Sequence, residues 1–293
     1  MALPSSVLCP IDFSPHAERA LRHAVALCGL FHARLTVLTV NDPLFVEAAA
    51  AAGHAGTMRG QVEAALHEVL ARVPGPDGHA PALDIATGPA ASEILKAAAR
   101  AHADLIVMGS QGLGGTSKLV FGSTAERVIR TSPVPVLAVP AGEPERIDGQ
   151  PGATRFVPGA VVAAVGLDSF DGAVAGTAAE WAVATGASLV LTHVCHEAQA
   201  PHWWRFAGVP HPPESLEAAA AQLAGLAAAL PEGAAGAVDV RLGQVPTGVA
   251  AVTRERDAGL LVVSRGGGDH RLGSVAYRIM CEAGLPTLVV SGR

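Results

Sequence analysis

Short apolar runs alternate with longer segments of helical periodicity along the first half of the chain. The runs are too short for helices and contain β-branched residues, so they predict buried strands, at residues 6–11, 35–40, 83–86, 105–108 and 133–139. Helices are predicted between them, at residues 15–28, 58–72 and 91–101 and from residue 122 onward. This alternation predicts a parallel sheet with helices on both faces, because strand–helix–strand crossovers are right-handed. Residues 43–57 fit neither pattern, and a mobile lid is one interpretation of them.

The pattern recurs after residues 143–158, which are rich in proline, glycine and charge and predict a linker. Residues 161–169 parallel residues 7–14, which places Asp168 where the first half has Asp12. Further parallels join residues 182–184 with 24–26, 189–194 with 35–40, and 286–290 with 135–139. The other predicted elements are helices at 216–230 and 247–256 and strands at 238–242 and 260–263. The repeat predicts two tandem domains, residues 1–142 and 159–293.

A glycine-rich loop follows the strand at 105–108, and a helix start follows the loop. Gly109 and Gly112 permit backbone angles and close approaches that a Cβ atom would forbid. Ser123 and Glu126 have the spacing of a capping box. A helix start suits a phosphate because its first N–H groups are unpaired and carry partial positive charge. Ligands of open parallel sheets bind at the carboxyl ends of the strands, where this loop lies.

The loop matches neither common phosphate motif, G-x-x-x-x-G-K-[ST] or G-x-G-x-x-G. Its spacing is Gly109, two residues, Gly112, nine residues, then Gly122 and Ser123. This spacing resembles the nucleotide-binding signature of the universal stress protein family, and residues 10–14 resemble the first-strand motif of that family. The resemblance covers nearly the whole chain. It implies two tandem α/β domains that pack as a pseudo-two-fold pair, each a doubly wound, five-stranded parallel sheet of strand order 3-2-1-4-5, adenine nucleotide alpha hydrolase-like.

The resemblance implies an ATP site, with or without Mg²⁺, formed by Asp12, Val40, Met108, Gly109, Gly112, Gly122, Ser123 and Thr124. In the family, the aspartate contacts the adenosine part and the backbone of the residue at Val40 contacts the adenine edge. Plainer interpretations stay open beside this one. Asp12 is then a solvated carboxylate that helps to cap the next helix, Val40 is a core residue, and the loop is an ordinary turn.

The corresponding loop of the second half departs from the pattern. Ser264 replaces the first glycine, Gly267 keeps the second, and only five residues separate Gly267 from Gly273. A loop shorter by four residues cannot follow the same path around a triphosphate. A structural role is therefore favoured for this half, and a smaller anion aided by Arg265 or Arg271 stays open.

Composition narrows the remaining classes of function. The formal net charge is −6 over 293 residues and no basic stripe is present, so nucleic acid is not expected as a partner. The four cysteines are scattered, the histidines lack helical i, i+4 pairs, and no signal peptide is apparent, so we expect a reduced, cytoplasmic protein without a metal site or a membrane segment. Trp203 and Trp204 lie in a proline-rich insertion and fit either a lid or an interface.

Three classes of function stay open. The first is a binding protein in which ATP is a regulatory ligand in a stress response, with slow hydrolysis allowed. The second is an enzyme that uses the same crevice, such as a nucleotidyl transferase, although no nucleophile elbow or second reactive pocket is evident. The third is an interaction module without a ligand. In the family, the fifth strands of two domains pair, so residues 136–139 and 288–290 are expected to pair within this chain, and a homodimer is plausible.

Overall fold

The computed structural model describes residues 3–75, 80–111, 121–142, 145–148, 154–167, 171–196, 214–231, 233–234, 236–266 and 273–290. The chain divides into two compact units. Leu3–Val157 forms the N-terminal unit together with the last strand, β12 (Thr287–Val290), and Pro158–Leu285 forms the C-terminal unit. Within the part of the chain listed above, no helix is long and apolar enough to cross a membrane.

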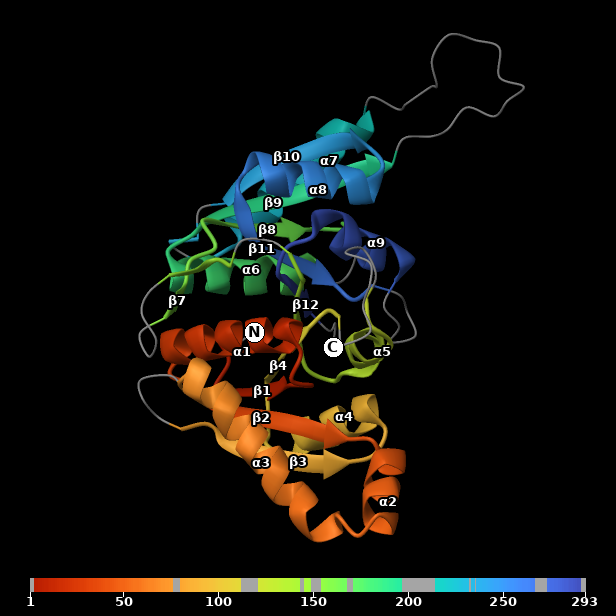
Figure 1. Cartoon of the computed structure of the whole chain (residues 1–293). Helices are drawn as coiled ribbons and strands as arrows, with labels where there is room; N and C mark the ends of the chain where they lie inside the picture. Colours follow the sequence, from red (N-terminus) through yellow and green to blue (C-terminus); the bar gives the residue numbers. More distant parts are fainter. Residues whose placement is uncertain are drawn as a thin grey trace, which may run out of the picture. The chain divides into compact units, whose positions relative to one another are not determined.

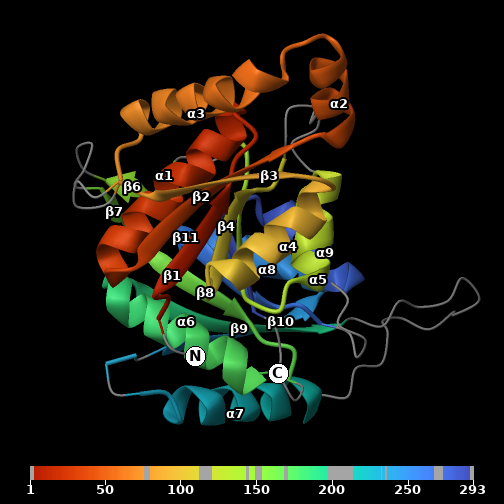
Figure 2. The ribbon, with the colours of Figure 1, turned by 90° about the horizontal axis from the view of Figure 1, so that it is seen from below.

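The N-terminal unit alternates strands and helices as the apolar pattern predicts (Figure 1). Its strands are β1 (Ser6–Pro10), β2 (Arg34–Asn41), β3 (Ala82–Thr87), β4 (Leu105–Gly109) and β5 (Val136–Val139). Its helices are α1 (Pro15–Phe31), α2 (Pro43–Ala51), α3 (Ala55–Arg72), α4 (Ala90–Arg100) and α5 (Ser123–Thr131). The five strands are parallel in the order β3-β2-β1-β4-β5, which confirms the predicted order. Figure 2 shows α1 and α3 on one face of this sheet and α4 and α5 on the other.

Residues 43–57, for which the sequence pattern predicted no element, are mostly helical. Helix α2 begins after Asp42, whose carboxylate accepts a hydrogen bond from the Leu44 N–H at 2.8 Å, and Pro43 occupies the first turn. The helix ends before Gly53, whose φ of 79° lies in the left-handed region. No residue of α2 is buried, because its alanine-rich sequence carries no stripe of large apolar side chains toward the sheet.

The last strand of the chain joins the N-terminal sheet. Strand β12 pairs antiparallel with β5, and Leu288 lies opposite Leu137. Both leucines are fully buried. The pairing expected between the two fifth strands is therefore confirmed, and β5 is no longer an open edge on that side.

The C-terminal unit repeats the same order of elements. Its strands are β8 (Ala160–Ala164), β9 (Ser188–His196), β10 (Gly236–Gly243) and β11 (Ala258–Ser264). Its helices are α6 (Asp171–Thr185), α7 (Glu214–Ala228), α8 (Val245–Glu255) and α9 (Ser274–Ala283). The strands are parallel in the order β10-β9-β8-β11. The insertion with Trp203 and Trp204 lies outside the described residues.

Equivalent backbone hydrogen bonds show which residues of the two halves correspond. The Ile11 N–H donates to Leu38 O at 2.8 Å, and the Val165 N–H donates to Thr192 O at 2.9 Å. Val165 therefore stands where the first half has Ile11, and the next residue, Gly166, stands where it has Asp12. The predicted match of Asp168 with Asp12 is wrong by two positions.

The predicted match in the helix after that strand is also wrong, by four positions. The Ala33 N–H donates to Cys28 O at 3.0 Å, and the Ala187 N–H donates to Ala182 O at 2.9 Å. Ala182 thus corresponds to Cys28 and not to Ala24, one helical turn away. The alanine-rich helices allowed a false match because their sequences look alike at several registers.

The linker is ordered in its described parts. Strands β6 (Ile147–Asp148) and β7 (Arg155–Phe156) form an antiparallel pair. The Val157 N–H donates to Arg146 O at 2.8 Å and continues this pairing. The prediction of a plain linker from its proline, glycine and charge therefore missed a small hairpin-like element that packs against α1.

Candidate functional site

The carboxyl ends of the central strands meet at one edge of the N-terminal sheet. Val7 of β1 lies opposite Leu35 of β2 and Leu105 of β4, and all three strands run in the same direction. Asp12 after β1, Val40 in β2 and Met108 and Gly109 in β4 therefore gather at the edge where ligands of such sheets bind. Val40 is partly exposed and Met108 is buried.

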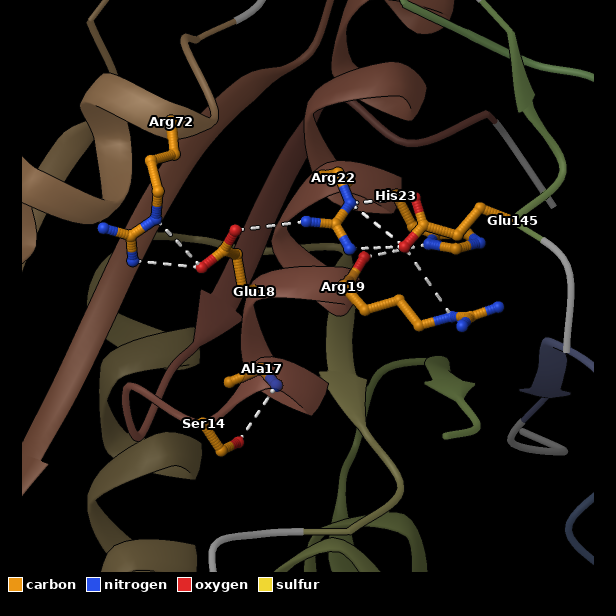
Figure 3. Close-up of polar contacts among 8 residues, drawn as sticks. All are labelled: Ser14, Ala17, Glu18, Arg19, Arg22, His23, Arg72 and Glu145. Atoms are coloured by element: carbon orange, nitrogen blue, oxygen red, sulfur yellow. Dashed lines mark hydrogen bonds and ion pairs between the residues drawn. The ribbon is translucent and has the colours of Figure 1, made fainter. Parts of the chain in front are cut away.

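Asp12 lies in the turn between β1 and α1 and is exposed. Its Oδ1 accepts hydrogen bonds from the Ser14 N–H at 3.1 Å and the Ser14 hydroxyl at 2.5 Å. Ser14 is the N-cap of α1, and its Oγ accepts from the Ala17 N–H at 3.1 Å (Figure 3). Phe13 between them has a φ of 62°, unusual for a residue with a side chain. The carboxylate thus supports the helix cap through Oδ1. Neither of these hydrogen bonds uses Oδ2, so they leave that oxygen for a ligand.

Gly109 ends β4 against the first turn of α1. A Cβ atom on Gly109 would lie 3.1 Å from the His16 carbonyl oxygen and 3.3 Å from the Gln111 carbonyl oxygen. Such a contact is shorter than ordinary van der Waals separation, so a side chain at this position would force the backbone of a neighbour to shift by a few tenths of an ångström. The glycine therefore lets the β4 end and the α1 start, which carries Asp12 and Ser14, lie side by side.

The two ends of the glycine-rich loop are joined by the backbone. The Ser110 N–H donates to Val139 O at 2.9 Å, and the Gly122 N–H donates to Ser110 O at 2.8 Å. Gly122 at the start of α5 is therefore held directly beside the end of β4. Gly112 and Lys118 lie outside the described residues.

Helix α5 begins without a side-chain cap. Gly122 is the N-cap, with φ −65° and ψ 148°, and no side chain makes a capping hydrogen bond. The predicted capping box is wrong because Ser123 is already the first helical residue, and the Glu126 carboxylate instead pairs with Arg130 at 2.8 Å. Ser123 is exposed and Thr124 is partly exposed. The first turn of this helix can therefore offer backbone N–H groups to an anion from outside.

The C-terminal unit joins its shorter loop in the same way. The Gly273 N–H donates to Arg265 O at 2.8 Å, and Gly273 is the N-cap of α9 with φ −65° and ψ 147°. Arg265, which corresponds to Ser110, is 7% exposed, and burial lowers the pKa of its guanidinium from the ordinary value. Gly267 and Arg271 lie outside the described residues. The helix start is thus preserved, whereas Gly166 leaves this unit without a counterpart of Asp12.

Sequence reasoning missed the role of Ser110, which is followed by Gln111. Both are buried polar residues directly after Gly109. Ser110 uses its backbone N–H and carbonyl to hold the loop ends, so its identity in the sequence carries no signal of this role. The signal that was present is the placement of two polar residues between two glycines at the end of an apolar strand.

Two features of the titratable groups in the described part of the chain bear on its chemistry. There, no cluster of three or more His, Cys, Asp or Glu side chains is arranged to hold a metal ion. Burial raises the pKa of the Cys9 thiol, with Cys28 nearby adding to the effect. Burial, and secondarily the charge of Asp104, raises the pKa of Cys28 to about 12. Both thiols are therefore protonated core groups at neutral pH.

Comparison with known proteins gives a consistent result. The sequence model of the universal stress protein family matches residues 5–140 and 159–291. A universal stress protein of Thermus aquaticus is 36% identical over 141 residues, which are 46% of this chain and 97% of that protein. One of Methanocaldococcus jannaschii is 32% identical over 143 residues, 47% of this chain and 82% of that protein. The crystal structure of a universal stress protein from Archaeoglobus fulgidus has the same fold, with a TM-score of 0.63 at 18% identity, over 98% of this chain and 96% of that one.

Proposed function

The chain belongs to the universal stress protein family, and we propose that it binds ATP at the carboxyl edge of its N-terminal sheet. The observation that carries this proposal is the start of α5. No side chain caps that helix, and the Gly122–Ser110 hydrogen bond holds its first turn beside the end of β4. A helix start in this condition attracts a polyphosphate through its N–H groups and its dipole.

The remaining site residues fit the other parts of the nucleotide. The exposed carboxylate of Asp12 lies at the end of β1, next to the end of β4, where it can contact the sugar. The partly exposed Val40 lies near the carboxyl end of the neighbouring strand and can offer its backbone to the base. Gly112, Ser123 and Thr124 complete the proposed set around the phosphates, and the ligand binds with or without Mg²⁺.

We propose a regulatory role for this ligand. Bound ATP changes the surface that the protein presents to partners in a stress response, and slow hydrolysis is compatible with that role. The C-terminal unit acts as a structural partner, because it has Gly166 in place of Asp12 and a shorter loop. The domain limits at residues 142 and 158, a homodimer, protein partners and a cytoplasmic location stay predictions of the same proposal.

Two equivalent glycines allow a matched test of the site. ATP is titrated into the full chain by calorimetry, with and without Mg²⁺, and into Gly122→Val and Gly273→Val variants. Both glycines are N-caps with extended backbone angles that valine adopts without strain. We expect Gly122→Val to weaken ATP binding by about tenfold to a hundredfold, the loss of one or two hydrogen bonds to charged phosphate. Gly273→Val should leave the affinity unchanged.

The outcomes separate the three classes of function. Equal affinity in Gly122→Val and the parent chain would place the ligand elsewhere, and no binding at all would favour an interaction module. ATP turnover with an added acceptor that is lost in Asp12→Ala would replace the regulatory role with an enzymatic one.

A further inference from the structure

The segment after residue 144 is bound to α1 by an ion pair. The Arg22 Nε atom donates to both carboxylate oxygens of Glu145, at 3.0 and 2.8 Å, and Arg22 Nη2 also donates to Oε1. Arg19 Nε lies 4.0 Å from the same carboxylate. Figure 3 shows Glu145 enclosed by these two arginines and His23 on one face of α1. Arg22 also reaches Glu18 at 3.2 Å, which ties the pair to the helix itself.

A buried aromatic contact lies beside this ion pair. Phe156 of β7 is 2% exposed, and its ring centroid is 5.9 Å from that of His23, which is fully buried. The His23 Nδ1 atom lies 3.0 Å from the Arg19 carbonyl oxygen. Because a carbonyl can only accept, Nδ1 carries the proton and Nε2 is the basic atom. Nε2 is buried and has no hydrogen-bond partner.

We propose that the described linker residues, 145–148 and 154–157, form an acid-releasable latch, in which the Glu145 ion pair and the Phe156 ring hold these residues on α1 only while His23 is neutral. Protonation would place an N–H donor and a charge at Nε2, in a buried position without an acceptor. A buried charge without a partner is strongly unfavourable, so the structure relaxes by exposing His23 and releasing Phe156.

The charges around His23 are consistent with this direction. Burial lowers the pKa of His23 to about 4, and this effect outweighs the Arg19 carbonyl and the Glu145 carboxylate, which act in the opposite sense. The positive charges of Arg19 and Arg22 on the same helix further disfavour the imidazolium. The hairpin-like element also carries Arg146, Asp148 and Arg155, and the last two lie opposite each other in its register.

Acid also weakens the ion pair, because it protonates the Glu145 carboxylate. Burial raises the pKa of Glu145, but the Arg22 hydrogen bond and the nearby positive charges more than offset this, so the pKa lies below its usual value. Acid therefore weakens both halves of the latch. Its release would free the described linker residues, 145–148 and 154–157, from α1.

A first test uses trypsin at neutral pH, because Arg146 and Arg155 are cleavage sites within the latch. In the full chain we expect slow cleavage after both arginines. Glu145→Gln should accelerate it roughly tenfold, and Phe156→Ala roughly a hundredfold or more, because cleavage follows the population of the open form. Glu255→Gln is the matched control, since Glu255 pairs with Arg241 at 2.8 Å in the C-terminal unit. It should leave the cleavage unchanged.

A second test follows acid release itself. The His23 ring is titrated by NMR, and hydrogen exchange of residues 145–157 is measured from pH 7 to pH 4 with correction for the intrinsic chemical rate. We expect His23 to titrate near 4, well below its usual 6.5, and exchange of the linker to rise through the same range. In His23→Leu, which packs on Phe156 without a titratable group, the part of the rise that follows the His23 titration should be absent, and only the part caused by protonation of Glu145 should remain.

Two results would overturn the proposal. One is a His23 pKa at or above 6.5 with tighter linker protection in acid, since Glu145 would then have turned to accept from the imidazolium. The other is equal cleavage of the parent chain, Glu145→Gln and Phe156→Ala, which would show that the linker is not held on α1.

Discussion

The close approach at Gly109 can be tested with a single methyl group. In Gly109→Ala, the new Cβ atom would lie 3.1 Å from the His16 carbonyl oxygen, although such contacts ordinarily begin near 3.4 Å. The neighbouring atom belongs to the backbone of α1, so it cannot rotate away as a side chain could. The helix start or the end of β4 must therefore shift by a few tenths of an ångström.

Both elements resist such a shift. The α1 start is anchored by the Ser14 cap and by Asp12, and β4 lies between β1 and β5 in the sheet. Overpacking a well-packed site costs about 1–3 kcal/mol. We expect Gly109→Ala to lower the free energy of unfolding of the N-terminal unit by this amount.

The measurement must report on the N-terminal unit alone. All three tryptophans and the single tyrosine lie after residue 158, so intrinsic fluorescence follows the other part of the chain. Hydrogen exchange of peptides from α1 and β4, measured in increasing denaturant, gives the required free energy. Gly60→Ala is the matched control, because Gly60 lies in α3 with open space around it. Alanine there should stabilise the helix by about 0.5–1 kcal/mol.

The two glycine variants should therefore change the stability in opposite directions. If Gly109→Ala were as stable as the parent chain, or more so, the close contact would not constrain this site. The account of why a glycine ends β4 would then be wrong.

Three further outcomes are expected. Above pH 6.5, His23 is neutral in both the folded and the unfolded chain and does not reduce the stability. As the pH falls to about 4, only the unfolded chain binds the proton, so the free energy of unfolding should fall by about 3 kcal/mol. Hydrogen exchange of α1 in increasing denaturant would measure this loss, which should be absent in His23→Leu. Ser14→Ala removes the cap of α1 and should lower the free energy of unfolding by about 1 kcal/mol in the same exchange measurement, whereas an unchanged value would argue against a stabilising cap. Leu288→Ala in β12 should cost about 2–5 kcal/mol and raise hydrogen exchange in β5, and unaltered exchange there would contradict the β5–β12 pairing.

Much of the fold could be predicted from the sequence, because the signals involved are local. Apolar runs such as residues 105–108 and 35–40 are too short for helices, and they are strands β4 and β2. Ser14 before Pro15 predicted the start of α1, since the cap depends on neighbouring residues alone. The strand order and the β5–β12 pairing followed from the family resemblance rather than from any local signal.

The candidate site was located but not completed by the sequence. The glycine spacing identified the loop and the helix that follows it, yet S-x-x-E fits more than one register. In the structure, Ser123 is the first residue of the helix and Gly122 is its N-cap. Likewise, only the backbone hydrogen bonds of Val165 showed that Gly166 replaces Asp12 in the second half.

The linker marks the boundary between what local sequence determines and what the tertiary structure decides. Proline, glycine and charge in residues 143–158 predicted a plain connection, because such a composition does not form a core by itself. Its fixation on α1 depends on Glu145 meeting Arg22 and on Phe156 meeting His23, more than 120 residues earlier in the chain. Contacts over that separation leave no periodicity or motif in the sequence. The sequence by itself therefore determined the elements and their order, while the fold decided which polar and aromatic side chains found partners.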